Sequence, residues 1–484
     1  MSKLPRSDEE IVEDLRGKKP ADKRAGNGEY NLTDLGNAER LVARHGADIQ
    51  YCHPRKTWLV WNGRCWEDDD TAEVERRAHE TVRSIYAEAT DIESKEGRAA
   101  MSKWARQSEA HVRIVAMVAE AKNKVYVRPG ELDAKPFLFN CLNGVVNLRT
   151  GTLGGHDRRL LMTRCAPVEY HPDATHAVWD AFLAASTRGD ADIAAFLARA
   201  VGYSLTGDTR EEKFFFLHGV PGTGKSTFID AVKAVMGGYC RTADFDTLVA
   251  RDFSGGVRDD IARLFGARLV TAVEVDEGKR LAEGLVASIT GGDTVTAREL
   301  YSRAVECRPQ FKLWIAANNE PMINSNDSPI WRRVVKIPFE HIIPDAEQDP
   351  HVKATLRDDL DARAAVLAWA VRGCLEWQER GLGVPDILIK ATAEYRAGQD
   401  ILADFREECC IAGIECRMDR NDGYKAYEEW CNETRIRQKE RLSLKAFTRR
   451  LGAQFPVKIS GKRRTFNGLG LRSDYHGQQQ AAEF

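Results

Sequence analysis

Residues 219–227 combine glycine, lysine and hydroxyl side chains at the spacing that phosphate binding requires. Their sequence follows G-x-x-x-x-G-K-S and lies between an apolar strand, 214–218, and an apolar helix, 228–236. The glycines let backbone N–H groups wrap phosphate oxygens, and the helix start adds its positive end. Lys225 would neutralise the β- and γ-phosphates of ATP, and Ser226 would ligate Mg²⁺. The residues expected to bind ATP are Gly219, Val220, Pro221, Gly222, Thr223, Gly224, Lys225, Ser226 and Thr227.

An acidic residue at the end of a neighbouring strand is also needed, to hold the metal and orient water. The apolar run 268–273 supplies such a strand, and Glu274, Asp276 and Glu277 follow it. A carboxylate inside the strand would be costly to bury, so the strand is expected to stop before Glu274. We favour Glu274 as the first acid and as a metal ligand beside Ser226, with Asp276 or Glu277 as the second acid. A solvated acidic turn is the alternative, and the register of the three acids stays open.

Two more apolar runs end or begin with residues that suit phosphate chemistry. Residues 311–317 lead into Asn318, whose amide at a strand tip could position the attacking water. Residues 334–339 are preceded by Arg332 and Arg333. One of these arginines could reach the nucleotide of a neighbouring subunit as an arginine finger. A surface ion pair is the alternative for each.

Together with residues 291–298 and 330–333, these segments resemble the motor of the superfamily 3 helicases. The resemblance is closest to the phage and plasmid primase–helicase group, which also includes the poxvirus primase–helicase. It extends upstream through residues 143–148 and 196–208, covers residues 130–345 well and extends loosely to the C-terminus. The resemblance implies a P-loop (AAA+-like) ATPase core with a five-stranded sheet, and a hexameric ring with nucleotide at subunit interfaces. It also implies 3′ to 5′ movement on single-stranded DNA.

The same resemblance implies a hairpin that touches DNA in the channel. Here the hairpin would lie within residues 301–310, with Arg303 and Arg308 as candidate phosphate contacts. An ordinary exposed side chain is the alternative for each arginine.

Many relatives of this group carry a primase domain before the motor. The first 130 residues are short for one and show no clear paired carboxylates with a downstream histidine. The acidic run 67–70 follows a hairpin and precedes a helix, so we interpret it as a helix cap. We therefore expect a helicase without primer synthesis, with a separate primase and other replication proteins as candidate partners.

Several elements must position these residues. Apolar strands alternate with helices from residue 213 to 339, which predicts an α/β core with a parallel sheet and helices on both faces. Upstream, Asn62-Gly63 between aromatic-rich runs predicts a hairpin. The expected organisation is a mobile leader (1–29), a mainly helical N-terminal α+β region (30–130), a helical domain (131–205), the ATPase domain (206–345), a helical extension (346–400) and a winged-helix-like domain (401–484).

The C-terminal segment is locally basic although the whole chain has a net charge of −2. Residues 432–464 hold 11 Lys and Arg against 2 Glu, the kind of excess that attracts phosphate backbones. Two helices followed by two short strands suggest a winged helix that binds duplex DNA, with Lys462, Arg463 and Arg464 in the wing. A protein-interaction module with a solvated basic face is the alternative.

The sequence favours a cytoplasmic protein, and the resemblance to the phage group implies the cytoplasm of a bacterial host. No apolar run approaches the roughly 20 residues that span a bilayer, and the charged N-terminus lacks a signal-peptide core. The 11 cysteines include no Cys-x-x-Cys pair. Cys409, Cys410, Cys416 and Cys431 form the densest group, for which buried thiols are favoured over a zinc site.

Two other functions fit part of this pattern. A P-loop enzyme that is not a helicase, such as a small-molecule kinase, would not need Asn318 or the arginine pair, and DNA would not stimulate it. A nucleotide-regulated origin-binding or loading platform would bind ATP without turnover. We expect an ATP-dependent DNA helicase, with ATP and Mg²⁺ as cofactors and DNA and further copies of the chain as partners.

Overall fold

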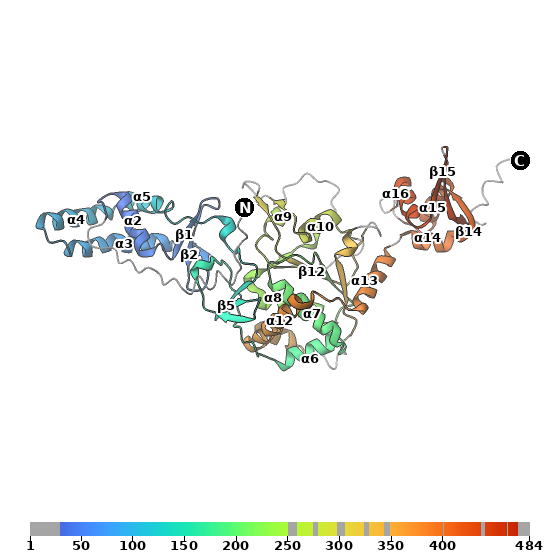
Figure 1. Ribbon diagram of the computed structural model, residues 1–484, viewed down its shortest axis with the longest axis horizontal. Coiled ribbons are helices and arrows are strands. Elements are labelled where there is room, and N and C mark those ends of the chain that lie inside the picture. Colours follow the sequence, from blue (N-terminus) through green and yellow to red (C-terminus); the bar gives the residue numbers. More distant parts are fainter. Residues whose placement is uncertain are drawn as a thin grey trace, which may run out of the picture. The chain divides into compact units, whose positions relative to one another are not determined.

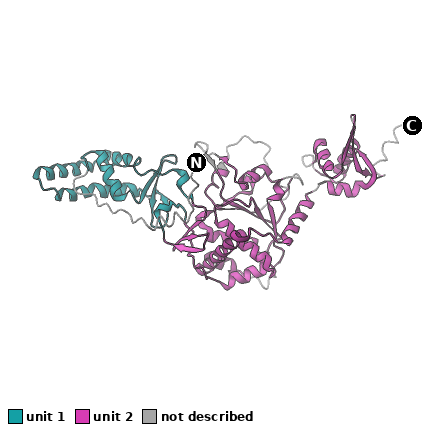
Figure 2. Ribbon diagram, in the orientation of Figure 1, with its two compact units in different colours: residues 1–134, 156–164 teal, residues 135–155, 165–484 magenta. Residues whose placement is uncertain are grey.

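The computed structural model describes residues 30–249, 259–273, 279–297, 305–323, 329–342, 349–399, 401–436, 441–461 and 463–472. It divides into two compact units (Figure 2). The first contains residues 1–134 and 156–164, and the second contains residues 135–155 and 165–484. Figure 1 labels the elements along the chain. In the described part of the chain, no helix combines the length and the apolar composition that crossing a membrane requires.

In its described residues, the first unit joins a three-stranded antiparallel sheet to four helices. Its helices are α2 (Asp34–His45), α3 (Glu73–Thr90), α4 (Lys95–Ser108) and α5 (His111–Ala121), with 3-10 turns η1 (Pro129–Glu131) and η2 (Arg158–Leu160). Its strands are β1 (Ile49–Cys52), β2 (Thr57–Trp61) and β3 (Trp66–Asp68), in the order β1-β2-β3. A buried network fixes α2 to α4, because the Asn37 side chain donates to Ser108 and accepts from the Trp104 indole.

Two local predictions in this unit are confirmed. The hairpin turns at Asn62-Gly63, where Gly63 has a φ of 96° and Trp61 pairs with Trp66. The acidic run caps the next helix: the Asp69 carboxylate accepts hydrogen bonds from the backbone N–H groups of Glu73, at 2.7 Å, and Val74, at 2.9 Å.

The second unit is built on a five-stranded parallel sheet. Its strands are β7 (Phe214–His218), β8 (Cys240–Ala243), β9 (Leu269–Val273), β12 (Lys312–Ala317) and β13 (Val334–Pro338), in the order β13-β7-β12-β9-β8. Every neighbouring pair is parallel. The predicted α/β core with a parallel sheet is therefore confirmed.

Helices and turns surround this sheet. The helices are α6 (Ala177–Ser186), α7 (Ala191–Leu205), α8 (Lys225–Met236), α9 (Asp259–Ala262), α10 (Glu283–Thr290), α11 (His351–Asp358), α12 (Leu360–Arg380) and α13 (Asp386–Gly398). The 3-10 turns are η3 (Gly237–Tyr239), η4 (Phe245–Thr247) and η5 (Pro329–Arg332). A three-stranded sheet of β4 (Leu138–Cys141), β5 (Gly144–Asn147) and β6 (Thr152–Gly154) precedes them.

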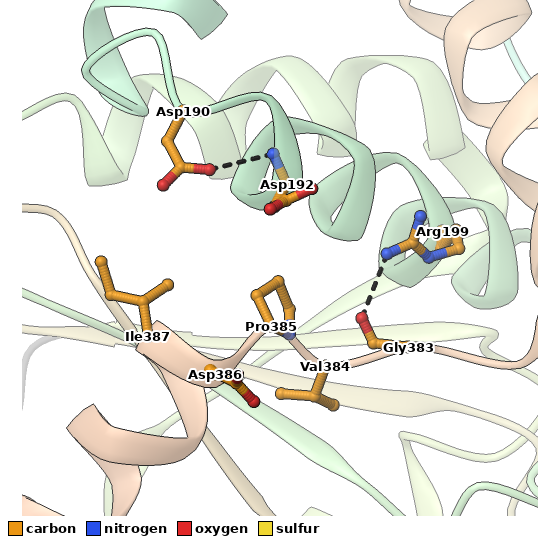
Figure 3. A pocket seen from close by; sticks show the side chains of 8 residues that line it. All are labelled: Asp190, Asp192, Arg199, Gly383, Val384, Pro385, Asp386 and Ile387. Carbon is orange, nitrogen blue, oxygen red and sulfur yellow. Dashed lines mark hydrogen bonds between the residues drawn. The ribbon is translucent and has the colours of Figure 1, made fainter.

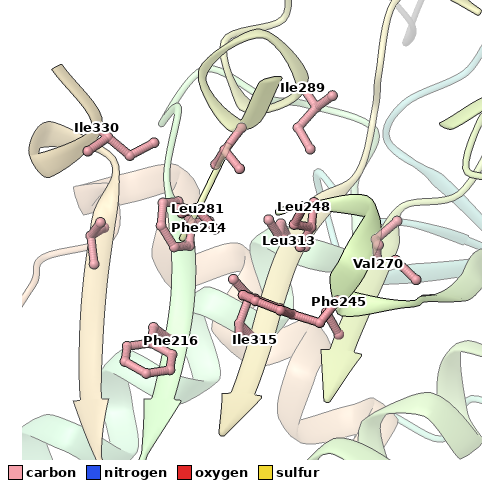
Figure 4. Packing of buried hydrophobic residues seen from close by; sticks show 14 of the residues in the cluster. Phe214, Phe216, Phe245, Leu248, Val270, Leu281, Ile289, Leu313, Ile315 and Ile330 are labelled. Atoms are coloured by element: carbon pink, nitrogen blue, oxygen red, sulfur yellow. The ribbon is translucent and has the colours of Figure 1, made fainter. Parts of the chain in front are cut away.

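Strand β7 is buried on both faces, as the apolar run in its sequence requires. Phe214 and Phe216 join a cluster on one face that includes Ile315 of β12 (Figure 4). Phe215, between them, contacts Phe196 of α7 and Trp314. Successive side chains of β7 therefore point to opposite faces of the sheet and pack into two separate layers.

Helices α7 and α12 cross so closely that no side chain would fit at Gly202 or Gly373. A Cβ atom at Gly373 would lie 2.0 Å from the Ala198 carbonyl oxygen, and one at Gly202 would lie 2.2 Å from the Cys374 nitrogen. The buried side chains of Arg268 and Lys312 join the end of α7 to the sheet, because Arg268 donates to the Leu205 carbonyl and Lys312 to that of Thr206. Cations are favoured at a helix C-terminus, where carbonyl groups lack partners.

The C-terminal segment has a hydrophobic core of its own. Its elements are α14 (Ile401–Cys409), β14 (Cys410–Asp419), α15 (Arg420–Glu433), α16 (Leu444–Gln454), β15 (Val457–Ser460) and β16 (Arg463–Leu471), with the strand order β14-β16-β15. The core packs Phe405, Tyr427 and Phe447 together, and the thiols of Cys409, Cys410 and Cys431 are buried in it. The predicted helices and terminal strands are present, whereas β14 was not predicted.

Candidate functional site

The glycine-rich loop joins β7 to α8 and has a backbone that needs its glycines. Gly222 and Gly224 have φ values of 83° and 87°, in the left-handed region that glycine favours. Gly219 packs against the neighbouring strand, since a Cβ atom there would lie 1.9 Å from the Phe339 carbonyl oxygen. The loop can therefore turn its N–H groups toward one point at the start of α8, as phosphate binding requires.

Lys225 lies inside this loop rather than in solvent. Its ammonium donates to the carbonyls of Gly219, at 2.7 Å, and Val220, at 2.8 Å, and makes a longer contact of 3.3 Å with the Thr223 hydroxyl. Burial lowers the pKa of Lys225, because the charged form loses hydration. The amino group is thus held at the loop, and the longest of its three contacts is the one that a phosphate oxygen could most easily replace.

The first turn of α8 completes this arrangement. The helix begins at Lys225, three residues earlier than predicted, because the last loop residues already have helical hydrogen bonding. Ser226 is exposed next to Lys225, and Thr227 is partly buried. An exposed hydroxyl at this position suits a metal ligand.

Asn318 lies at the same edge of the sheet as the loop. The residue before it, Ala317, pairs with His218, which is the last residue before the loop. On the other side of β12, Val273 of β9 pairs with Ala316. The exposed Asn318 therefore follows its strand at the level where the loop begins. The three predicted acids, Glu274, Asp276 and Glu277, lie outside the described residues.

His218 was not singled out from the sequence, although it ends the strand that leads into the loop. Burial is the main cause that lowers the pKa of its imidazole, and the nearby charge of Lys336 acts in the same direction. Lys336 is paired with Glu320, which follows Asn318 by two residues. The sequence feature that could have indicated these three side chains is a histidine immediately before the glycine motif.

The two candidate finger arginines lie at the opposite edge of the sheet. Both precede β13, and the Arg333 carbonyl accepts a hydrogen bond from the N–H of Phe214, at the start of β7. Arg332 is exposed, while Arg333 is partly buried and pairs with Glu212 at 2.9 Å. The length of β7, roughly 16 Å, therefore separates both from the loop of their own chain.

The hairpin before β12 begins earlier than predicted. Strand β10 (Val295–Ala297) pairs with β11 (Val305–Cys307), so the first strand precedes the predicted range 301–310. The sequence Val-Thr-Ala after Gly291-Gly292 supplies this strand, because Gly292 has a φ of 69° and turns the chain. Arg308 follows the second strand and is exposed, and Arg303 lies outside the described residues.

The basic residues near the C-terminus are exposed on two elements. Arg463 and Arg464 open β16 and pair with Ser460 and Ile459 of β15. Lys445 and Arg449 are exposed one turn apart on α16. Lys462 lies outside the described residues.

A pocket elsewhere in the second unit shares no residue with the loop. It lies between the start of α7 and the segment before α13, and Asp190, Asp192 and Asp386 are among its lining residues (Figure 3). Arg199 closes one side by donating to the Gly383 carbonyl. The Asp190 carboxylate is already engaged as the cap of α7, so the pocket has no evident link to the phosphate chemistry.

Two family models match separate parts of the chain. Residues 38–186 match the D5 N terminal like family, and residues 217–333 match a family of unknown function, DUF5906. These matches, with the relatives described next, confirm the resemblance to the phage-type primase–helicase group that the motifs indicated. The first match begins well before residue 130, so the resemblance reaches further upstream than the motifs indicated.

The chain is also similar to two viral proteins named as helicases. It is 26% identical to the "Putative helicase L207/L206" of Acanthamoeba polyphaga mimivirus, over 62% of this chain and 33% of that protein. It is 26% identical to the "Putative helicase 022R" of Frog virus 3, over 59% of this chain and 30% of that protein. The chain thus spans about a third of the length of these curated relatives.

Among solved structures, the apo form of the NrS-1 C terminal region is similar at 12% identity. It has a TM-score of 0.46, with 90% of this chain and 100% of that chain covered.

Proposed function

We propose that the chain is an ATP-dependent DNA helicase of the superfamily 3 type that acts in phage or plasmid replication. The observation that carries the proposal is the loop from Gly219 to Lys225, which lies at the same edge of a parallel sheet as Asn318. Similarity to two proteins named as helicases supports the unwinding activity.

The residues of the candidate site have distinct roles in this proposal. The loop N–H groups and Lys225 bind the phosphates of ATP, and Asn318 orients the attacking water. The exposed Ser226 fits as a Mg²⁺ ligand with Glu274, and the ion would supply charge stabilisation to the phosphates. The absence of a primase activity in this chain stays a prediction.

The position of the arginine pair supports a ring. Arg332 and Arg333 lie at the edge of the sheet opposite the loop, so an arginine finger from this pair must serve a neighbouring copy. Head-to-tail contacts that close on themselves give a cyclic assembly, and we propose a hexamer around single-stranded DNA.

ATP turnover, measured with and without single-stranded DNA, tests the function. We expect hydrolysis that DNA stimulates, together with unwinding of a tailed duplex. Turnover that is indifferent to DNA would favour an enzyme of another class. ATP binding without turnover would favour a loading platform.

We further propose that residues 401–472 form a winged-helix domain that binds duplex DNA. The order α14, β14, α15, α16, β15 and β16 and the separate core support this assignment. In such a domain α16 would enter the major groove, and the hairpin of β15 and β16 would touch the backbone.

Salt dependence of DNA binding tests this domain. In fragment 400–484, replacing Lys462, Arg463 and Arg464 with glutamine should flatten the log–log slope of affinity against salt by roughly two units. Arg463 and Arg464 are successive residues of β16 and point to opposite faces, so we do not expect both to contact phosphate at once. Fluorescence anisotropy with a labelled duplex measures the slope.

A second triple variant controls for net charge alone. Replacing Arg420, Lys425 and Arg435 with glutamine changes the charge of the fragment equally, but it alters α15 and the second residue after that helix. We expect this variant to change the slope by less than one unit. Equal slopes for the two variants, or a fragment that does not bind DNA at low salt, would favour the protein-interaction alternative.

A further inference from the structure

The C-terminal end of α6 and the turn that follows it lie next to the glycine-rich loop. A Cβ atom at Gly224 would be 3.2 Å from the Ser186 hydroxyl and 3.1 Å from the Phe182 ring. At the other end of the loop, Arg188 is 3.7 Å from the carboxylate of Glu340. Glu340 directly follows Phe339, whose carbonyl contacts Gly219. The turn is therefore tied to both ends of the loop.

The sheet order indicates which part of a nucleotide would reach this turn. Asn318 directly follows β12, on one side of β7, and the reacting phosphate must lie beside it in the function proposed above. Glu340 follows β13, on the other side of β7. A nucleotide whose terminal phosphate lies toward β12 therefore extends its ribose and base toward β13 and Arg188.

The backbone at Arg188 is unfavourable for an arginine. Arg188 follows the end of α6 with a φ of 54°, a position where glycine is usual, and Gly189 follows with a φ of 72°. A non-glycine residue in the left-handed region has an energetic cost. The side chain is nevertheless 60% exposed, and the Glu340 carboxylate that faces it is 64% exposed. Such a pair adds little to stability, so packing does not explain the arginine.

The unpartnered hydroxyl of Ser186, the last residue of α6, points to a ligand beside the turn that carries Arg188. Ser186 is 7% exposed, and its oxygen has no hydrogen-bond partner among the described residues. Buried polar atoms are normally paired, so one left without a partner beside a loop glycine indicates a site that a ligand completes.

We propose that Arg188 binds the nucleoside end of the nucleotide in its own subunit. The guanidinium donates to acceptor atoms of the ribose or base, while the loop and Lys225 bind the phosphates. This inference rests on the proposed ATP-binding function and adds a residue that determines affinity rather than the rate of the chemical step.

The test compares Arg188→Gly and Arg188→Asn with the unaltered full-length chain. Both residues tolerate the left-handed backbone, so neither variant should lower the melting temperature. We expect the Kd for ATP, measured with a fluorescent analogue, and the KM for ATP to rise roughly tenfold, because a charged donor is lost. The value of kcat should stay within about twofold, since transition-state contacts are unaltered.

Arg435→Gly is the matched control. Arg435 also follows a helix in the left-handed region, with a φ of 57°, but it belongs to the C-terminal segment. This variant should leave the Kd for ATP unchanged. Inorganic tripolyphosphate supplies a second control, because it lacks a nucleoside. Its inhibition constant should be the same for Arg188→Gly and the unaltered chain.

The outcomes separate this inference from the function on which it rests. Unchanged ATP affinity in both Arg188 variants would overturn it, and an equal loss of tripolyphosphate affinity would make Arg188 a phosphate ligand instead. If the unaltered chain binds no ATP, or if Lys225→Ala binds it equally well, the proposed function itself fails.

Discussion

Replacing Lys225 with alanine is expected to lower ATP turnover by about 10²-fold or more, the scale of a lost transition-state charge contact. Lys225 supplies the ammonium that the loop holds through the carbonyls of Gly219 and Val220. Because burial lowers the pKa of this ammonium, its removal relieves an unfavourable desolvation, and we expect the fold to persist. Circular dichroism and thermal melting check that expectation beside the turnover assay.

Lys233→Ala is the matched control for this result. Lys233 belongs to the same helix, α8, two turns beyond Lys225, and its removal changes the net charge equally. We expect turnover within a factor of two of the unaltered chain. If Lys225→Ala keeps turnover at that level as well, the loop does not bind the reacting phosphates.

The glycine-rich loop could be predicted from the sequence because its chemistry lies within nine consecutive residues. Its glycines, Lys225 and Ser226 need only the strand before them and the helix after them. The same holds for the hairpin at Asn62-Gly63 and the Asp69 cap, where each partner is within five residues. Interactions between residues that are close in the sequence can therefore be recognised from the sequence alone.

The register that places Asn318 beside the loop could not be predicted. The apolar runs showed that strands exist, but they did not show which strands are neighbours or which residues pair. Ala317 pairs with His218 across a gap of many residues, so only the packed sheet fixes the relation. The position of Arg332, at the edge of the sheet opposite the loop, also follows only from the pairing of the strands.

Strand β14 and Arg188 were missed for different physical reasons. Most side chains of β14 are exposed, and its register shifts between Ala412 and Arg417, so no alternation marks it as a strand. Arg188 takes a backbone conformation that would have been recognisable for glycine but carries no signal for arginine. Its place beside the loop depends on how α6 packs.

Arg332→Ala is expected to lower turnover about 10³-fold or more, the effect of losing an arginine finger. Arg332 is exposed and lies too far from the loop of its own chain to act there. Arg333, by contrast, is held by Glu212 at 2.9 Å and is only 18% exposed. We therefore infer that Arg332 is the finger and that Arg333 positions the turn before β13.

Glu212→Ala separates the two arginines. If Arg333 acts through its ion pair with Glu212, then Arg333→Ala and Glu212→Ala should lower turnover by similar factors. The loss of turnover in Arg332→Ala should exceed both losses, because this variant removes the group that we expect to contact the reacting phosphate of a neighbouring subunit. A larger loss for Arg333→Ala than for Arg332→Ala would exchange the two roles.

Mixing two inactive variants tests whether the site is shared between subunits. In a ring assembled from Lys225→Ala and Arg332→Ala chains, some interfaces combine an intact Lys225 from one chain with an intact Arg332 from the next. At equal amounts about one interface in four is complete, so turnover should recover toward a quarter of the unaltered value if interfaces act independently. Recovery should be greatest near an equal ratio and should need exchange of subunits before the assay.

Turnover that stays at the level of the separate variants at every ratio would contradict this expectation. It would show that Arg332 does not complete a neighbour's site, or that an interface hydrolyses ATP only when every interface of the ring is intact. Rings of Lys225→Ala and unaltered chains distinguish these cases, because strict coupling makes turnover fall much more steeply than the fraction of altered chains.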